Sequence, residues 1–219
     1  MSLMNRLPLS GNEGAGKAPT SVRNTLEAIC ADASLHARLL NTLSLLEHIG
    51  SRKIMLARSE AADADVLRHL AEETRHAYFF KRAAERVAGR ALNYGTVHTL
   101  AGACARFYMG RLDARITAAL RGRHRSLPYR YMSLVIEDRA IWTYRIYQQA
   151  LAASHCGISL NAVLAEESQH LKSMLEQVRA LDSDAEKHIA AFCAMEHREF
   201  ERLWNAITSD CAALRAAAE

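Results

Sequence analysis

One seven-residue segment occurs twice in this chain, and both copies lie within long stretches of helical period. Residues 70–76 read LAEETRH and residues 164–170 read LAEESQH, with five identities and one Thr/Ser exchange. Each copy has a Glu three positions before a His, and residues i and i+3 share one face of an α-helix. Each copy therefore presents a carboxylate and an imidazole side by side. Two such helices facing one another would supply most of the ligands of a metal site.

The composition predicts an all-α protein. The 219 residues include only three Pro and ten Gly, while the strong helix formers Ala, Leu, Arg and Glu are abundant. A chain of this length buries a core as one sizeable domain or two small ones. The net charge of +4 and the pI near 8.9 say little about partners. No apolar run approaches the roughly 20 residues that span a bilayer, so no membrane span is expected.

The pattern along the chain predicts a flexible tail over residues 1–20 and a single helical domain over residues 21–219. The tail lacks the apolar core of a secretory signal and is rich in Gly, Ser and Asn. Helices are expected over 21–30, from Asp32 or Ser34 to 58, over 61–87, 96–120 and 128–154, from Ser159 or Asn161 to 181, and over 182–214. Long helices with short connections favour a helical bundle.

The five cysteines are scattered, odd in number and without a Cys-x-x-Cys pair. This usage is typical of reduced thiols in a cytoplasmic protein, and most of the cysteines are expected to be small core residues. The predicted location is therefore the cytoplasm.

A lone Glu among apolar residues precedes each Glu-x-x-His segment. Glu47 lies in LLEHI, 26 residues before Glu73, and Glu137 lies in LVIEDRAI, 30 residues before Glu167. Either interval fits one antiparallel helix hairpin, which would bring the lone Glu level with the Glu-x-x-His pair. Carboxylates on apolar helix faces are costly to bury, and four together would repel one another unless cations bind.

The pattern allows two other interpretations. A solvated face with incidental i,i+3 pairs would explain the charges, but the apolar neighbours of Glu47 and Glu137 argue against it. A pairing that uses Glu72 and Glu166, one position earlier in each repeat, stays open because spacing alone does not decide it.

The order Glu, Glu-x-x-His, Glu, Glu-x-x-His over residues 34–181 resembles the ferritin-like di-iron carboxylate superfamily. The resemblance implies an all-α, ferritin-like four-helix bundle, here with an extra helix between the two hairpins and a C-terminal helix. It implies two iron ions, and the carboxylate-rich ligand set would also suit manganese. Glu73 and Glu167 would bridge the ions, and Glu47 and Glu137 would be terminal ligands. The full set of ligands implied in this way is Glu47, Glu73, His76, Glu137, Glu167 and His170.

Further residues near these positions are candidates for supporting roles. Tyr144 lies seven positions after Glu137, where it could be a redox-active or gating tyrosine or else a core residue. His69 lies four positions before Glu73 and could support the ligands, with a partly exposed helical histidine as the alternative. Asp138 and Arg139 flank a ligand and are expected to orient the histidines through hydrogen bonds.

Within the superfamily, the chain is similar to the oxygen-activating enzymes. It lacks the paired Cys-x-x-Cys motifs of full rubrerythrins, and the 61 positions between His76 and Glu137 leave room for a helix that storage ferritins do not have. The segment Ile136-Glu137-Asp138-Arg139 is similar to the Ile-Glu-x-Arg of the tRNA-modifying di-iron hydroxylase. Residues 121–125 (RGRHR) with Arg130 would suit RNA phosphates, or would be cations at a helix C-terminus.

The resemblance implies a di-iron oxidoreductase, a hydroxylase or monooxygenase, acting on a small-molecule or tRNA-borne substrate. The substrate pocket would include Phe80, Ile141 and Tyr144. Electrons would come from a separate reductase, because no flavin or Fe–S motif is visible. The alternatives are a ferroxidase, a peroxide scavenger or an iron-binding protein without an organic substrate, and a helical interaction module. The sequence leaves the oligomeric state open, and a homodimer is one assembly that it allows.

Overall fold

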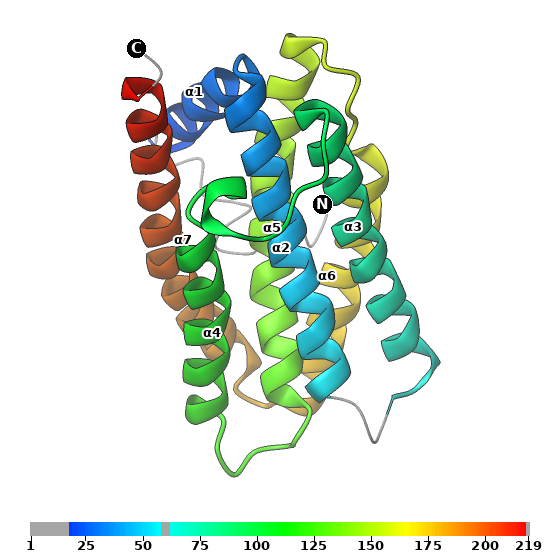
Figure 1. The fold of residues 1–219 in the computed structure, drawn as a ribbon. Coiled ribbons are helices and arrows are strands. Elements are labelled where there is room, and N and C mark those ends of the chain that lie inside the picture. Colours follow the sequence, from blue (N-terminus) through cyan, green and yellow to red (C-terminus); the bar gives the residue numbers. More distant parts are fainter. Residues whose placement is uncertain (1–17, 58–61, 218–219) are drawn as a thin grey trace. The chain divides into compact units, whose positions relative to one another are not determined.

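The structure is a computed structural model that describes residues 18–57 and 62–217 (Figure 1). These residues form helices joined by short connections and contain no strand, which confirms the prediction of an all-α fold. The α-helices are α1 (Ala18–Cys30), α2 (Ala33–Ala57), α3 (Ala64–Ala88), α4 (Gly102–Ala119), α5 (Leu127–Ser154), α6 (Asn161–Leu181) and α7 (Ala185–Ala216), and η2 (Thr96–His98) is a short 3₁₀ helix.

Local capping explains where the repeat-bearing hairpin begins and ends. Asp32 is the cap of α2, since its Oδ1 accepts hydrogen bonds from the amides of Ser34 and Leu35 at 2.8 and 3.1 Å. The carboxylate of Asp63 accepts the amide of Val66 at 2.9 Å and starts α3 at Ala64. Gly89 ends α3 in the left-handed conformation, with φ of 66°.

The helix expected over residues 96–120 is the main error in the predicted boundaries. Within residues 96–101 only Thr96–His98 is helical, as a short 3₁₀ helix, and α4 begins at Gly102. The Thr42 hydroxyl binds both the amide and the carbonyl of Leu100, each at 2.9 Å. The amide of Ala101, whose φ is 51°, donates to the Asp210 carboxylate at 2.7 Å. These tertiary hydrogen bonds hold the segment out of a helix.

The expected tail over 1–20 lies largely outside the described residues, and α1 already begins at Ala18. The described chain divides into two compact units. The first unit comprises the residues up to Glu27 together with Leu112–Arg198. The second unit comprises Ala28–Arg111 together with the residues from Glu199 onward. The single domain over 21–219 stays a prediction.

The second unit contains the hairpin of α2 and α3, which run antiparallel and side by side (Figure 1, blue to teal). The Ser44 hydroxyl on α2 donates a hydrogen bond to the carbonyl of Ala77 on α3 at 2.7 Å. Leu40 and Phe80 are completely buried in this unit. Burial of one such side chain contributes about 1.5–3 kcal/mol to the stability of the fold. The buried apolar face therefore stabilises the hairpin.

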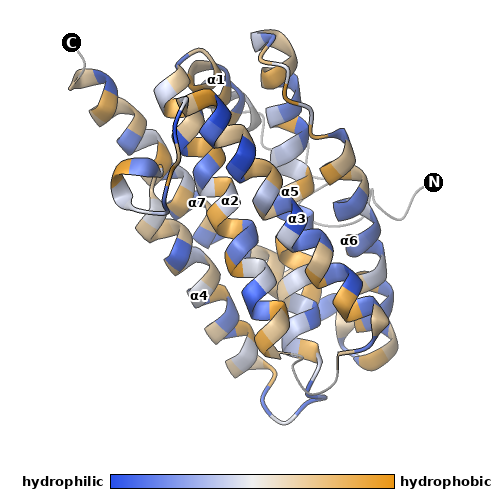
Figure 2. Ribbon diagram, turned by 45° about the vertical axis from the view of Figure 1, so that its right-hand side comes forward, coloured by the Kyte–Doolittle hydropathy of each residue, from blue (hydrophilic) through white to orange (hydrophobic). Residues whose placement is uncertain are grey.

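The first unit contains the second hairpin, formed by α5 and α6 (Figure 1, green to yellow). His155 ends α5 in the left-handed conformation, and the Gln148 side chain on α5 accepts the amide of Leu160 at the start of α6. Figure 2 shows hydrophilic and hydrophobic residues interleaved along these helices, as expected where one face is buried. Among the helices of the described residues, none combines the length and apolar character needed to cross a membrane.

Candidate metal centre

The candidate ligands of the second unit are arranged around the carboxylate of Glu73. His69, Glu73 and His76 lie at i, i+4 and i+7 on α3, so all three share one face, and all are buried. Glu73 Oε1 lies 3.5 Å from His69 Nε2 and 3.9 Å from His76 Nδ1. Glu47, on the neighbouring helix α2, is buried as well. One oxygen of Glu73 thus has an imidazole on either side along the helix.

A glycine on α2 makes room for this carboxylate. A Cβ added at Gly50 would lie 3.3 Å from Glu73 Oε2, closer than most side-chain contacts. Glycine costs helix stability relative to alanine, by about 0.5–1 kcal/mol in a helix interior. The close approach of the Glu73 carboxylate gives a physical reason for a glycine at this position.

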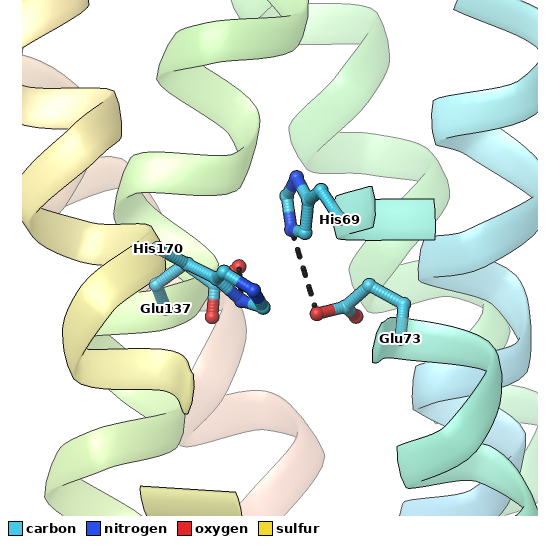
Figure 3. Close-up of side chains that lie close together, drawn as sticks. All are labelled: His69, Glu73, Glu137 and His170. Carbon is cyan, nitrogen blue, oxygen red and sulfur yellow. Dashed lines mark ion pairs between the residues drawn. The ribbon is translucent and has the colours of Figure 1, made fainter. Parts of the chain in front are cut away.

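The first unit also buries two glutamates and a histidine among its candidate ligands. Glu137 lies on α5, and Glu167 and His170 lie three positions apart on α6; all three are buried. His170 Nδ1 lies 3.4 Å from Glu167 Oε2 and 3.6 Å from Glu137 Oε1, so carboxylates from two helices flank one imidazole nitrogen. Figure 3 shows Glu137 beside His170, and His69 joined to Glu73 by the dashed ion pair.

These side chains could hold metal ions. The donor set consists of carboxylate oxygens and imidazole nitrogens, which are ordinary ligands of divalent metals. Burial of several carboxylates is unfavourable without compensating charge, and a bound cation provides it. The donor chemistry of the site therefore fits a metal. The buried members of the candidate groups are Glu47, His69, Glu73, His76, Glu137, Glu167 and His170.

Burial separates the two adjacent glutamates of each repeat. Glu73 is 7% exposed and Glu167 is 1% exposed. Glu72 and Glu166, the alternative pair left open by spacing, are only half-buried. The second Glu of each repeat thus points into its unit, and the first lies nearer to the surface.

The structure also places the residues expected to support the ligands. His69 is buried rather than partly exposed, and its contact with Glu73 makes it a candidate ligand as well as a supporting residue. Asp138 and Tyr144 are buried within the first unit. The guanidinium of Arg139 donates to the Glu196 carboxylate at 2.8–3.1 Å.

Two residues of α7 that the sequence reasoning did not single out take part in this network. Glu196 is completely buried, and His197 Nδ1 lies 3.3 Å from Arg139 Nη2. A signal for Glu196 was present, because it lies near Phe192 and Cys193 in the same way that Glu47 lies among leucines.

Part of the basic segment at 121–125 belongs to the packing of the first unit. Arg123 forms ion pairs with Asp182 at 2.9 Å and Asp184 at 2.8 Å. The buried Asp182 carboxylate also accepts the Tyr131 hydroxyl at 2.7 Å and contacts His188 Nδ1 at 2.6 Å. Burial tends to raise the pKa of Asp182, but these hydrogen bonds outweigh it and lower the pKa. Burial and the bond to Asp182 raise the pKa of Tyr131.

The residues expected to line a substrate pocket are all buried: Phe80 in the second unit, and Ile141 and Tyr144 in the first. The five cysteines form no disulfide, and Cys193 and Cys211 are buried core residues. The chain matches no protein-family model, no curated protein and no solved structure.

Proposed function

We propose that this chain is a non-haem di-iron protein, in which α2, α3, α5 and α6 form a ferritin-like four-helix bundle. We further propose that it is an O₂-activating oxidoreductase, a hydroxylase or monooxygenase, that acts on an organic substrate with electrons from a separate reductase. One observation carries the proposal: each of the two hairpins buries a lone Glu together with a Glu-x-x-His pair. The proposed ligands are Glu47, Glu73, His76, Glu137, Glu167 and His170.

Charge balance supports two divalent ions rather than one. The four proposed carboxylates carry four negative charges, which two divalent cations neutralise, whereas one cation would leave a net charge of about −2 in a buried site. Carboxylate oxygens with one imidazole per ion suit iron or manganese better than copper. Of these two, iron is proposed because it supports oxygen chemistry.

Each ligand has a role in this proposal. Glu73 and Glu167, which occupy equivalent positions in the two repeats, would hold the ions together with His76 and His170. Glu47 and Glu137, from the preceding helix of each hairpin, would supply the remaining carboxylates. The buried imidazole of His69, whose Nε2 lies 3.5 Å from Glu73 Oε1, would orient that carboxylate.

The proposed reaction converts one C–H bond to C–OH. One molecule of O₂, two electrons and two protons enter, and one oxygen atom leaves as water. Bound iron would supply the electrons to O₂ one or two at a time, and the reductase would restore them. The apolar side chains of Phe80 and Ile141 exclude water from the reaction. Tyr144, on the face of Glu137, is the proposed redox-active or gating residue.

Anaerobic reconstitution with ferrous iron tests the metal assignment. We expect about two irons per chain, and a loss of most of this iron in Glu73→Gln and His170→Ala. The adjacent Glu72→Gln and Glu166→Gln are matched controls, because they alter the same charge in the same motif and should keep the iron. Equal iron loss in the control variants, or full iron in Glu73→Gln, would show that the ligand assignment is wrong.

Reaction with O₂ then separates an oxygenase from a ferroxidase or storage protein. In the proposed function, O₂ uptake by the iron-loaded protein continues only while a reductant is supplied, and iron stays at about two per chain. Uptake that follows added ferrous iron and leaves a growing ferric mineral would instead favour the ferroxidase alternative.

A further inference from the structure

Helix α3 has two faces of different chemistry. Its buried face carries His69, Glu73 and His76. Its opposite face is exposed and carries large apolar side chains, with Tyr78 61% and Leu67 54% exposed. An aromatic side chain with this degree of solvent exposure commonly marks an interaction surface.

Around Tyr78, this face forms an open groove of about 650 Å³. Its lining includes Arg75, Tyr78, Phe79, Arg82, Glu85 and Arg86, all from α3. Three guanidinium groups and one carboxylate give the groove a net positive charge. We refer to these six residues as the arginine–tyrosine groove.

The groove is partly organised before any partner binds. Arg82 Nη1 lies 3.5 Å from the Tyr78 hydroxyl, and its guanidinium lies 5.9 Å from the centre of that ring. The carboxylate of Glu85 accepts the amide of Leu92 at 3.2 Å, an interaction with the chain beyond the end of α3. A preordered arginine loses less conformational entropy when it pairs with a carboxylate.

We infer that the arginine–tyrosine groove is the docking site for an acidic electron-carrier protein. This inference rests on the proposed function, since it names the kind of partner that would reduce the metal centre. Charge complementarity favours an acidic surface, which three arginines bind through bidentate pairs with carboxylates. The groove also lies on the helix that bears Glu73, so about one helix diameter, roughly 10 Å, separates a docked carrier from the proposed ligands.

The composition of the groove favours a protein over RNA as the partner. Tyr and Arg are enriched at the centres of protein interfaces, whereas Lys is depleted, and no lysine lines the groove. The rings of Tyr78 and Phe79 also give the groove apolar area that phosphates would not use. A single helix face also matches the small interfaces of transient electron-transfer complexes, below about 1,200 Å².

The stoichiometry of the proposed reaction fits such a carrier. A reduced iron–sulfur carrier gives up one electron in each encounter and leaves oxidised. Two encounters supply the two electrons that each hydroxylation consumes. Weak, salt-sensitive docking suits this use because the carrier must leave between encounters.

The test uses the iron-loaded full chain and a plant-type [2Fe–2S] ferredoxin with an acidic surface as the probe. Binding is measured by calorimetry at 50 and 300 mM salt for the wild type, Arg82→Glu/Arg86→Glu, and the control pair Arg52→Glu/Arg145→Glu. Arg52 and Arg145 are exposed, and neither lies on α3 or lines the groove. We expect the groove variant to bind about tenfold or more weakly, the control to bind as the wild type does, and binding to weaken at the higher salt.

The outcomes separate this inference from the proposed function. Full iron content in the groove variant together with weakened ferredoxin binding supports the docking site. No binding by the wild type, or equal weakening in both charge-reversed pairs, overturns it. A mixed-sequence single-stranded RNA that binds the wild type and depends on Arg82 and Arg86 more strongly than the ferredoxin does also overturns it. A chain that binds ferredoxin at the groove but no iron would disprove the proposed function alone.

Discussion

Arg139 on α5 and Glu196 on α7 form a buried, two-pronged ion pair. Arg139 Nε lies 2.9 Å from Glu196 Oε1, and Arg139 Nη2 lies 2.8 Å from Glu196 Oε2. The guanidinium also lies 5.0 Å from the centre of the Trp142 ring. Both charged side chains belong to the first unit, where they join α5 to α7.

Removal of one partner of this pair should strongly destabilise the protein. In Arg139→Ala, the carboxylate of Glu196 would stay buried without its main counter-charge, and we expect the free energy of unfolding to fall by about 3–5 kcal/mol. Urea unfolding followed by circular dichroism measures this change. Arg145→Ala, at an exposed position on the same helix, is the control and should change stability by at most about 0.5 kcal/mol. Similar losses in the two variants would contradict the role of the pair.

Gly50 should matter for metal binding, although glycine lowers the stability of the helix relative to alanine. In Gly50→Ala, the new methyl group would lie 3.3 Å from Glu73 Oε2, so the carboxylate would have to shift by a few tenths of an ångström from its present position. We expect the iron content after ferrous reconstitution to fall well below that of the wild type, measured by a colorimetric iron assay.

Gly110→Ala is the matched control for this experiment. Gly110 also lies within a helix, α4, and a Cβ there would meet nothing within 4 Å. This variant should keep its iron and gain about 0.5–1 kcal/mol in stability from the better helix former. An iron content in Gly50→Ala equal to that of the wild type would show that iron binding does not require the present position of the Glu73 carboxylate.

Asp182 should contribute stability that is lost in acid. Its folded-state pKa lies below the unfolded value of 3.8, so its ionised form stabilises the fold above that pH. This contribution disappears as the pH falls through the lower folded-state pKa. The difference in unfolding free energy between the wild type and Asp182→Asn should therefore be constant above about pH 5 and shrink toward pH 2.5.

Chemical unfolding at several pH values checks this prediction. The groups that face Asp182 are Arg123, Tyr131 and His188. Asp184→Asn is the control, because Asp184 also pairs with Arg123 but is half exposed. A difference between the wild type and Asp182→Asn that stays constant down to pH 2.5 would count against the prediction.

Cys193 should be among the least reactive thiols of the native protein. Burial, with the nearby charges of Asp138 and Glu196, raises its pKa to about 12. Because the thiolate is the reacting form, alkylation by iodoacetamide at pH 8 should modify the half-buried Cys30, Cys104 and Cys156 first. Mass spectrometry of tryptic peptides gives the order, and the unfolded protein, in which the thiols should react at similar rates, is the control. Early modification of Cys193 would contradict its burial.

Helical period and capping residues determined much of the secondary structure. Asp32 begins α2 and Gly89 ends α3 where the sequence predicts it, because capping is a local interaction between neighbouring residues. The stretch before Gly102 was predicted as helix and is not. There, the side chains of Thr42 and Asp210, from distant parts of the chain, accept hydrogen bonds from the backbone amides of Leu100 and Ala101. Local helix propensity does not predict such long-range hydrogen bonds.

The sequence by itself determined the all-α class and the two repeats, since the spacing of Glu73 from His76 and of Glu167 from His170 is a property of the helix alone. Only the tertiary structure decided which glutamate of each repeat is buried, and that His69 is buried against Glu73. It alone also revealed Glu196, 57 residues from Arg139, as the partner of that arginine. Burial and long-range pairing depend on how helices pack, and helical period specifies a face without specifying what that face meets.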